Sequence, residues 1–259
     1  MITIENEALG YYKLGFLNIK INTDEDLSNL NLLVKNQSNV FSTFLHEYIH
    51  FLQNFTTTSG LYSSTFYTQF IKYLVQKIKD DPKQNIHLPL KLDNNFNRIS
   101  QNELNTIYLG QSGFIRNRVI YNSYYNTIEE IKDISSNEGI KPKKYFIDFT
   151  NTDNYKQEKY HFGIIALKEY VAHKIQNKFY SIQHPDIPYI VADLILDKEL
   201  PELKNNDDLK ILLCDASLMT FHPAEFFFTT IEKLKLEKKI PKNPKTKASL
   251  KSMISFEGK

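Results

Sequence analysis

The sequence predicts a mainly helical α+β fold that forms one domain. Apolar residues recur at helical spacing through much of the 259-residue chain, while alternating segments that are typical of strands occupy residues 1–22 and 145–162. A chain of this length is sufficient for one sizeable hydrophobic core. We therefore expect a single domain over residues 1–240, followed by a basic tail over residues 241–259.

The composition indicates a globular protein of the cytoplasm. Hydrophobic residues make up 41% and charged residues 24% of the chain, and the formal net charge of +2 gives no reason to expect nucleic acid as a partner. The single cysteine, Cys214, has no intramolecular disulfide partner, which is typical of a reducing compartment. Residues 1–7 lack the basic and apolar regions of a signal peptide, and no uncharged apolar stretch reaches membrane-spanning length. Neither export nor a membrane partner is expected.

Short strands are expected at the start of the chain. Within residues 1–22, Gly10 marks a turn, and residues 16–21 alternate apolar and polar side chains. Thr23 is of a type that caps helices, so it predicts a short helix over residues 24–29.

Helical periodicity is strongest over residues 38–54. The polar run at residues 56–60 separates this helix from a second one, which ends near residue 79. Residues 80–112 are rich in Asn, Asp, Pro and Gln, so we interpret them as an irregular insertion with one strand at residues 86–92.

The second half of the chain is expected to be helical apart from one hairpin. Helical character resumes over residues 115–134. Two strand-like segments, residues 145–149 and 159–162, then flank the turn-rich residues 150–154, which predicts the hairpin. Further helices are expected at residues 164–180, 186–198, 207–220 and 223–236.

The motif His46-Glu47-Tyr48-Ile49-His50 lies on the helix at residues 38–54. Two histidines four residues apart share one helix face, so both can direct an imidazole nitrogen at one metal ion. The adjacent Glu47 carboxylate can accept a proton from water beside that ion. This spacing predicts a catalytic metal site.

The charge distribution around the motif supports this interpretation. Between Asn36 and Ile71, Glu47 is the only formally charged side chain, whereas solvated helix faces usually carry Lys and Glu. We therefore expect this segment to be buried and Glu47 to need a cation nearby. The alternatives are an ordinary solvent-exposed polar stripe and an accidental pair of core histidines.

The motif helix resembles that of the zincin metallopeptidases. No glycine and third histidine follow His50 at the metzincin spacing, so the resemblance favours the gluzincin branch, in which a glutamate on a second, downstream helix is the third ligand. The resemblance implies a zincin-like fold with a small N-terminal sheet and a motif helix packed on that second helix. It also implies a Zn²⁺ cofactor, and a substrate peptide that binds the sheet edge as an added strand.

The best candidate for the downstream ligand is Glu169. It lies on a face with Ile165, Ala166 and Ala172, where small neighbours allow two helices to approach closely. The alternatives left open are Glu129, Glu130, His161, His173, Asp215 and Glu225.

Two polar residues are expected to support the site. His173 lies one turn after Glu169 on the same face, where it could hydrogen-bond a ligand or stabilise an oxyanion. Gln53 lies one turn after His50 and could hold a ligand or a substrate amide.

The sequence thus predicts a zinc-dependent hydrolase, a peptidase that acts on peptide or protein substrates. Its zinc ligands are His46, His50 and Glu169, and Glu47 is the general base. The alternative is an inactive, metal-stabilised binding module. The basic tail could contact an acidic partner or could simply be a solvated terminus.

Overall fold

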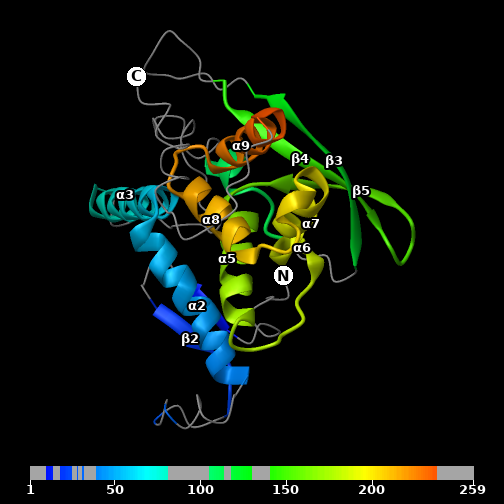
Figure 1. The fold of residues 1–259 in the computed structure, drawn as a ribbon. Helices are drawn as coiled ribbons and strands as arrows, with labels where there is room; N and C mark the ends of the chain where they lie inside the picture. Colours follow the sequence, from blue (N-terminus) through cyan, green and yellow to red (C-terminus); the bar gives the residue numbers. More distant parts are fainter. Residues whose placement is uncertain are drawn as a thin grey trace.

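The computed structural model describes residues 10–13, 18–24, 28, 31, 39–80, 105–113, 118–129 and 141–237 (Figure 1). The elements, in chain order, are β1 (Gly10–Lys13), β2 (Asn18–Ile21), α2 (Asn39–Thr56), α3 (Thr58–Asp80), β3 (Val119–Ile128), β4 (Lys143–Asn151), β5 (Gln157–Phe162), α5 (Ile164–Asn177), α6 (Asp186–Tyr189), α7 (Val191–Glu199), the 3₁₀ helix η3 (Pro201–Leu203), α8 (Asp207–Leu218) and α9 (Pro223–Glu237). The expected α+β fold with mainly helical content is confirmed.

Strands β3, β4 and β5 form an antiparallel sheet in that order. On the central strand β4, burial alternates, and the side chains of Tyr145, Ile147 and Phe149 are at most 4% exposed. Helices α7 and α9 contact the sheet on its β3 and β4 strands, as Figure 1 shows. The apolar face of the sheet is therefore covered by the C-terminal helices.

Helix α5 connects the sheet to the helix that carries the motif. It begins at the end of β5 and packs against α8 and, elsewhere along its length, against α2 (Figure 1). Its residues Ala166, Leu167 and Tyr170 are fully buried in the core that the sheet forms with α7, α8 and α9. This burial fixes the helix on which Glu169 lies.

Helices α2 and α3 meet at a tight corner. Only Thr57 separates them, and Gly60 lies so close to α2 that an added Cβ would come within 2.3 Å of the Gln53 carbonyl oxygen. Strands β1 and β2 pair in antiparallel fashion and pack on α2. Gly10, which was expected at a turn, is instead the first residue of β1 and pairs with Ile21.

The expected helix over residues 115–134 is wrong, because residues Val119–Ile128 form strand β3. This segment is rich in β-branched and aromatic residues, which lose side-chain freedom in a helix and fit a pleated sheet. The pairing register with β4 also shifts between Tyr121 and Ser123, which interrupts the alternation along the strand.

The other expected elements of the second half are present. The predicted hairpin is β4 and β5, and helices α5, α8 and α9 fall where they were expected. The helix expected at residues 186–198 is divided into α6 and α7 around Ile190. The strand predicted at residues 86–92 and the tail predicted at residues 241–259 lie outside the described residues, as does most of the helix predicted at residues 24–29. Among the helices that the structure describes, none combines the length and apolar character needed to cross a bilayer.

Candidate metal centre

His46 and His50 of α2 face Glu169 of α5 across the packed helix pair. The Nε2 atoms of the two histidines are 3.1 Å apart. Glu169 Oε2 is 3.1 Å from Nε2 of His46 and 3.3 Å from Nε2 of His50. Two helices that are more than 100 residues apart in sequence thus bring three ligand atoms together.

These separations suit a zinc ion. Ligand atoms about 2.0–2.1 Å from a tetrahedral zinc are separated from one another by about 3.3 Å. The three measured separations, 3.1, 3.1 and 3.3 Å, are close to this value. A set of two imidazole nitrogens and one carboxylate oxygen is also a common catalytic zinc set.

Gln53 determines which nitrogen of His50 carries a proton. The Gln53 side-chain amide donates from Nε2 to the carbonyl oxygen of Lys168, at 3.2 Å. Its Oε1 therefore faces His50 Nδ1, at 2.9 Å, and can only accept a hydrogen bond. Nδ1 of His50 must donate, which leaves the Nε2 lone pair of neutral His50 towards Glu169.

Gln176 of α5 constrains His46 in the same way. Its Oε1 lies 3.2 Å from His46 Nδ1, while its Nε2 donates to the backbone oxygen of Ser42 at 3.0 Å. With both histidines neutral, the three converging atoms are all acceptors and no proton lies between them. Such an arrangement is unfavourable unless a cation or a proton lies between these atoms.

In the metal-free protein a proton partly fulfils this requirement. Burial alone would lower the pKa of His50, but the adjacent Glu169 carboxylate outweighs it and raises that pKa. Burial would likewise raise the pKa of Glu169, but the charges of and hydrogen bonds from His50 and His46 outweigh it and lower that pKa. Both shifts show that the cluster favours positive charge at its centre.

Glu47 lies beside this cluster. It is 9% exposed, and the backbone N–H of Tyr12 in β1 donates a hydrogen bond to it. Burial raises the pKa of its carboxyl group, against the opposing pull of His50 and His46. A buried carboxylate with a raised pKa is suited to take up and release a proton.

The burial of α2 is only partly as expected. Its polar stripe is buried, including Gln53 and Asn54 at 4% exposed, because this stripe faces α5. The apolar residues Tyr48, Leu52 and Phe55 are 40–45% exposed. The expectation that this segment is buried is therefore confirmed for its polar stripe and wrong for these apolar residues.

Residues near α6 complete the surroundings of His46, and the sequence did not single them out. The ring of Tyr189 lies 5.8 Å from that of His46 and stacks on His184 at 4.4 Å. Burial, and then the charges of Glu169 and Glu47, raise the pKa of Tyr189. Its hydroxyl group is thus a neutral donor near both carboxylates. Residues 184–189 contain only one histidine and one aromatic residue, so no local pattern in the sequence marks them.

His173 is close to these residues, but no hydrogen bond among the described residues joins it to His46, His50 or Glu169. Asn177 Nδ2 donates to its Nε2, and its Nδ1 has no hydrogen-bond partner among the described residues. Its ring lies 5.0 Å from that of His184.

The other proposed third ligands lie elsewhere. Within the described part of the chain, one group of three or more His, Cys, Asp or Glu side chains could hold a metal, and it consists of His46, His50 and Glu169. His161 instead contacts the Ile107 carbonyl oxygen, and Glu225 accepts a hydrogen bond from Lys143. Glu129 and Asp215 are outside the group, and Glu130 lies outside the described residues.

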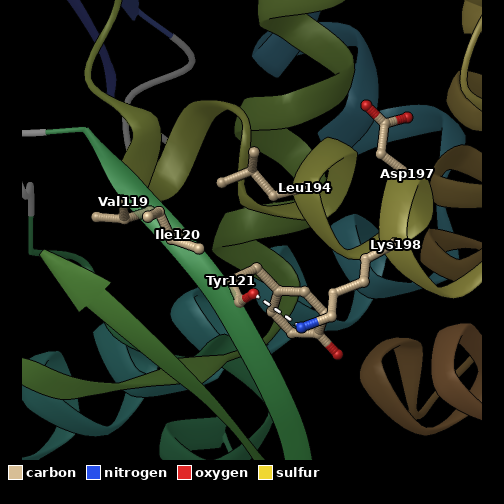
Figure 2. A pocket seen from close by; sticks show the side chains of 6 residues that line it. All are labelled: Val119, Ile120, Tyr121, Leu194, Asp197 and Lys198. Atoms are coloured by element: carbon tan, nitrogen blue, oxygen red, sulfur yellow. Dashed lines mark hydrogen bonds between the residues drawn. The ribbon is translucent and has the colours of Figure 1, made fainter. Parts of the chain in front are cut away.

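A separate hollow of about 330 Å³ lies between β3 and α7 (Figure 2). Lys198 reaches across it and donates to the backbone oxygens of Tyr121 and Asn122. The backbone N–H of Val119 donates to Asp186. These side chains satisfy backbone groups of the edge strand β3, which protects that edge from pairing with another strand. None of the residues that line this hollow belongs to the metal cluster.

Comparison with known proteins gives no relationship: no family model, no curated protein and no solved structure matches the chain.

Proposed function

We propose that the protein is a zinc-dependent hydrolase that cleaves peptide bonds. The observation that carries the proposal is the convergence of three acceptor atoms, from His46, His50 and Glu169, beside the buried carboxylate of Glu47. This is the arrangement that the His-Glu-x-x-His spacing predicts for a zincin-like peptidase.

Each residue of the cluster has a distinct role in this proposal. His46, His50 and Glu169 hold the ion. A bound zinc supplies a Lewis acid that polarises the scissile carbonyl group and makes water more acidic. Glu47 accepts a proton from the attacking water as the new carbon–oxygen bond forms. It then delivers that proton to the amine nitrogen as the carbon–nitrogen bond breaks.

The position of Glu47 favours an enzyme over a metal-stabilised binding module. A structural zinc site is closed by four protein ligands, whereas a catalytic site has three and an open position. The cluster offers three ligands, and the Glu169 side chain remains 23% exposed, so the cluster is not sealed from solvent. A structural site would also have no need of a buried carboxylate at position 47.

The test measures zinc content and peptide hydrolysis together. Wild-type protein and the variants His46→Ala, Glu47→Gln and Glu169→Ala are loaded with zinc, dialysed and analysed by mass spectrometry. Activity is measured on a mixture of internally quenched peptides. We expect about one zinc per wild-type chain. The ion should be retained in Glu47→Gln, lost in His46→Ala and weakly held in Glu169→Ala, with all three variants inactive.

Glu202→Gln, which changes an exposed glutamate, is the matched control and should behave as wild type. Wild-type protein that takes up no zinc would overturn the metal site. Full activity in Glu47→Gln would leave the ion in place but exclude Glu47 as the base.

A further inference from the structure

Gln176 has every hydrogen-bonding position of its side chain occupied. It is 1% exposed. Its Nε2 donates to the backbone oxygen of Ser42 at 3.0 Å and to Ser42 Oγ at 2.9 Å. Its Oε1 is 3.2 Å from His46 Nδ1 and 3.1 Å from His184 Nε2. An amide has two donor hydrogens and two acceptor lone pairs, so this group is saturated.

These contacts fix the orientation of the amide. A backbone carbonyl can only accept, so the Gln176 NH₂ group must face Ser42 and its oxygen must face the two imidazoles. Both imidazoles therefore donate, His46 from Nδ1 and His184 from Nε2. For His46, a proton on Nδ1 directs the Nε2 lone pair towards Glu169.

The same oxygen connects the metal cluster to the segment between α5 and α6. His184 belongs to this segment, and its ring stacks on Tyr189 with an interplanar angle of 26°. Tyr189 in turn lies next to His46. One amide thus holds a metal ligand and, through His184, the tyrosine nearest to that ligand.

We propose that Gln176 is the positioning residue of this site. Its side-chain oxygen orients His46 so that Nε2 faces the metal, and it also holds His184, which keeps Tyr189 beside His46. This inference rests on the proposed metal site. Many proteins hold a ligating histidine with a carboxylate, which adds negative charge. The amide of Gln176 orients His46 without adding charge, so the two histidines and Glu169 leave a bound dication with a net positive charge.

Two measurements test this role. The first uses Co²⁺ as the probe: titration with this ion gives the affinity, and its visible spectrum reports the coordination. Gln176→Leu removes the acceptor, and we expect it to weaken Co²⁺ binding by about 10–100-fold and to alter the spectrum. Gln176→Glu loses the two donors to Ser42 but retains an acceptor for both imidazoles, so we expect it to bind Co²⁺ more tightly than Gln176→Leu does. Gln183→Leu changes an exposed glutamine of the same segment and serves as the control.

The second measurement is two-bond ¹H–¹⁵N NMR of the metal-free wild-type protein, which identifies the imidazole nitrogen that carries a proton. We expect neutral His46 to be protonated on Nδ1. Protonation on Nε2 would overturn the inference even if neither Gln176 variant folds.

The outcomes separate this inference from the proposed function. If Gln176→Leu binds Co²⁺ with wild-type affinity and spectrum, or if a folded Gln176→Glu binds as weakly as Gln176→Leu, the positioning role is wrong and the metal site stands. If wild-type protein binds neither zinc nor Co²⁺, the proposed function fails, and the NMR result on His46 decides the orientation on its own.

Discussion

Tyr189 is the residue, other than the proposed zinc ligands and general base, whose substitution is expected to affect catalysis most. Its pKa is raised by burial and by the nearby carboxylates, so its hydroxyl group stays protonated and can stabilise negative charge that develops on a substrate oxygen. We expect Tyr189→Phe to lower kcat by about 100-fold with zinc content unchanged. The measurement is kcat and KM with the zinc content of the same samples. Tyr155→Phe, at a residue 80% exposed, is the control. An unchanged kcat in Tyr189→Phe would exclude this role.

Among individual residues, the sequence could predict those that are marked by a pattern in their immediate neighbours. His46, Glu47 and His50 follow from helical spacing and from the absence of other charges around them. Glu169 could be proposed because small residues share its face. Gln176 and His184 could not be found in this way, since a glutamine that bonds a histidine 130 positions away leaves no periodic pattern.

Among the helices, α5, α7 and α8 are joined by a network of charged side chains. Lys210 of α8 is 1% exposed and donates to Asp193 and Asp197 of α7 and to the backbone oxygen of Lys204. Lys174 of α5 also pairs with Asp193. Burial alone would raise the pKa of Asp193, but hydrogen bonds from Lys210 and Lys174 outweigh it and lower that pKa.

Removing the buried cation should therefore destabilise the fold. We expect Lys210→Met to reduce the free energy of unfolding by about 3 kcal/mol, because it removes the cation that pairs with Asp197 and one of the two cations that pair with Asp193. Lys178→Met is the control: Lys178 and Asp208 form an exposed pair, and its loss should cost less than about 1 kcal/mol. Urea denaturation of both variants measures the difference. Equal, small losses would show that the network contributes little.

Helices and strands could likewise be predicted where their own residues show a regular apolar pattern. Helices α5, α8 and α9 have apolar faces that pack on the core, so their periodicity could be recognised. Strand β3 could not be recognised as easily, because the irregularity at Tyr121 and Ser123 interrupts its alternation. Helix α2 was located correctly, but its apolar face is half-exposed, because the polar stripe is the face that contacts α5.

In the molecule as a whole, metal binding should stabilise helix α2 more than the sheet and the C-terminal helices. The core cluster joins the sheet to α5, α7, α8 and α9, and none of its described residues belongs to α2. Helix α2 is joined to α5 mainly by polar contacts, which include the pairs Lys168–Asn54 and Gln176–Ser42. A metal bound by both helices would add a further connection at this interface.

Zinc should thus slow hydrogen exchange in α2 by about 10-fold or more, with little change in β4. Exchange measured by mass spectrometry, with and without zinc, tests this expectation. His46→Ala is the control in which zinc should have no effect. Equal protection of α2 and β4 by zinc would show that the metal stabilises the whole fold together.

Stability of the metal-free protein should also depend on the buried His173 and on the half-buried His161 and His184. The pKa values of His161, His173 and His184 are each lowered to about 4, mainly by burial, from a usual value of about 6.5. Between pH 6.5 and 4 the unfolded chain therefore binds up to three more protons at these positions than the folded chain. Stability rises with pH wherever the unfolded state binds more protons, so it is lost as the pH falls through this range.

The raised pKa values of His50 and Glu47 act in the opposite direction, because these groups bind protons more readily in the folded state. The contribution of one histidine is therefore best isolated by substitution, and His161 is suitable because it is not part of the group formed by His46, His50 and Glu169. In His161→Gln, the slope of the unfolding free energy against pH should fall by the equivalent of up to one proton between pH 6.5 and 4.5. Urea denaturation of metal-free protein at several pH values gives this slope.

Above pH 7.5, where the imidazole of His161 is neutral in both states, wild type and variant should have the same slope. A variant with the wild-type slope at acidic pH would show that His161 is protonated as readily in the folded chain as in the unfolded one.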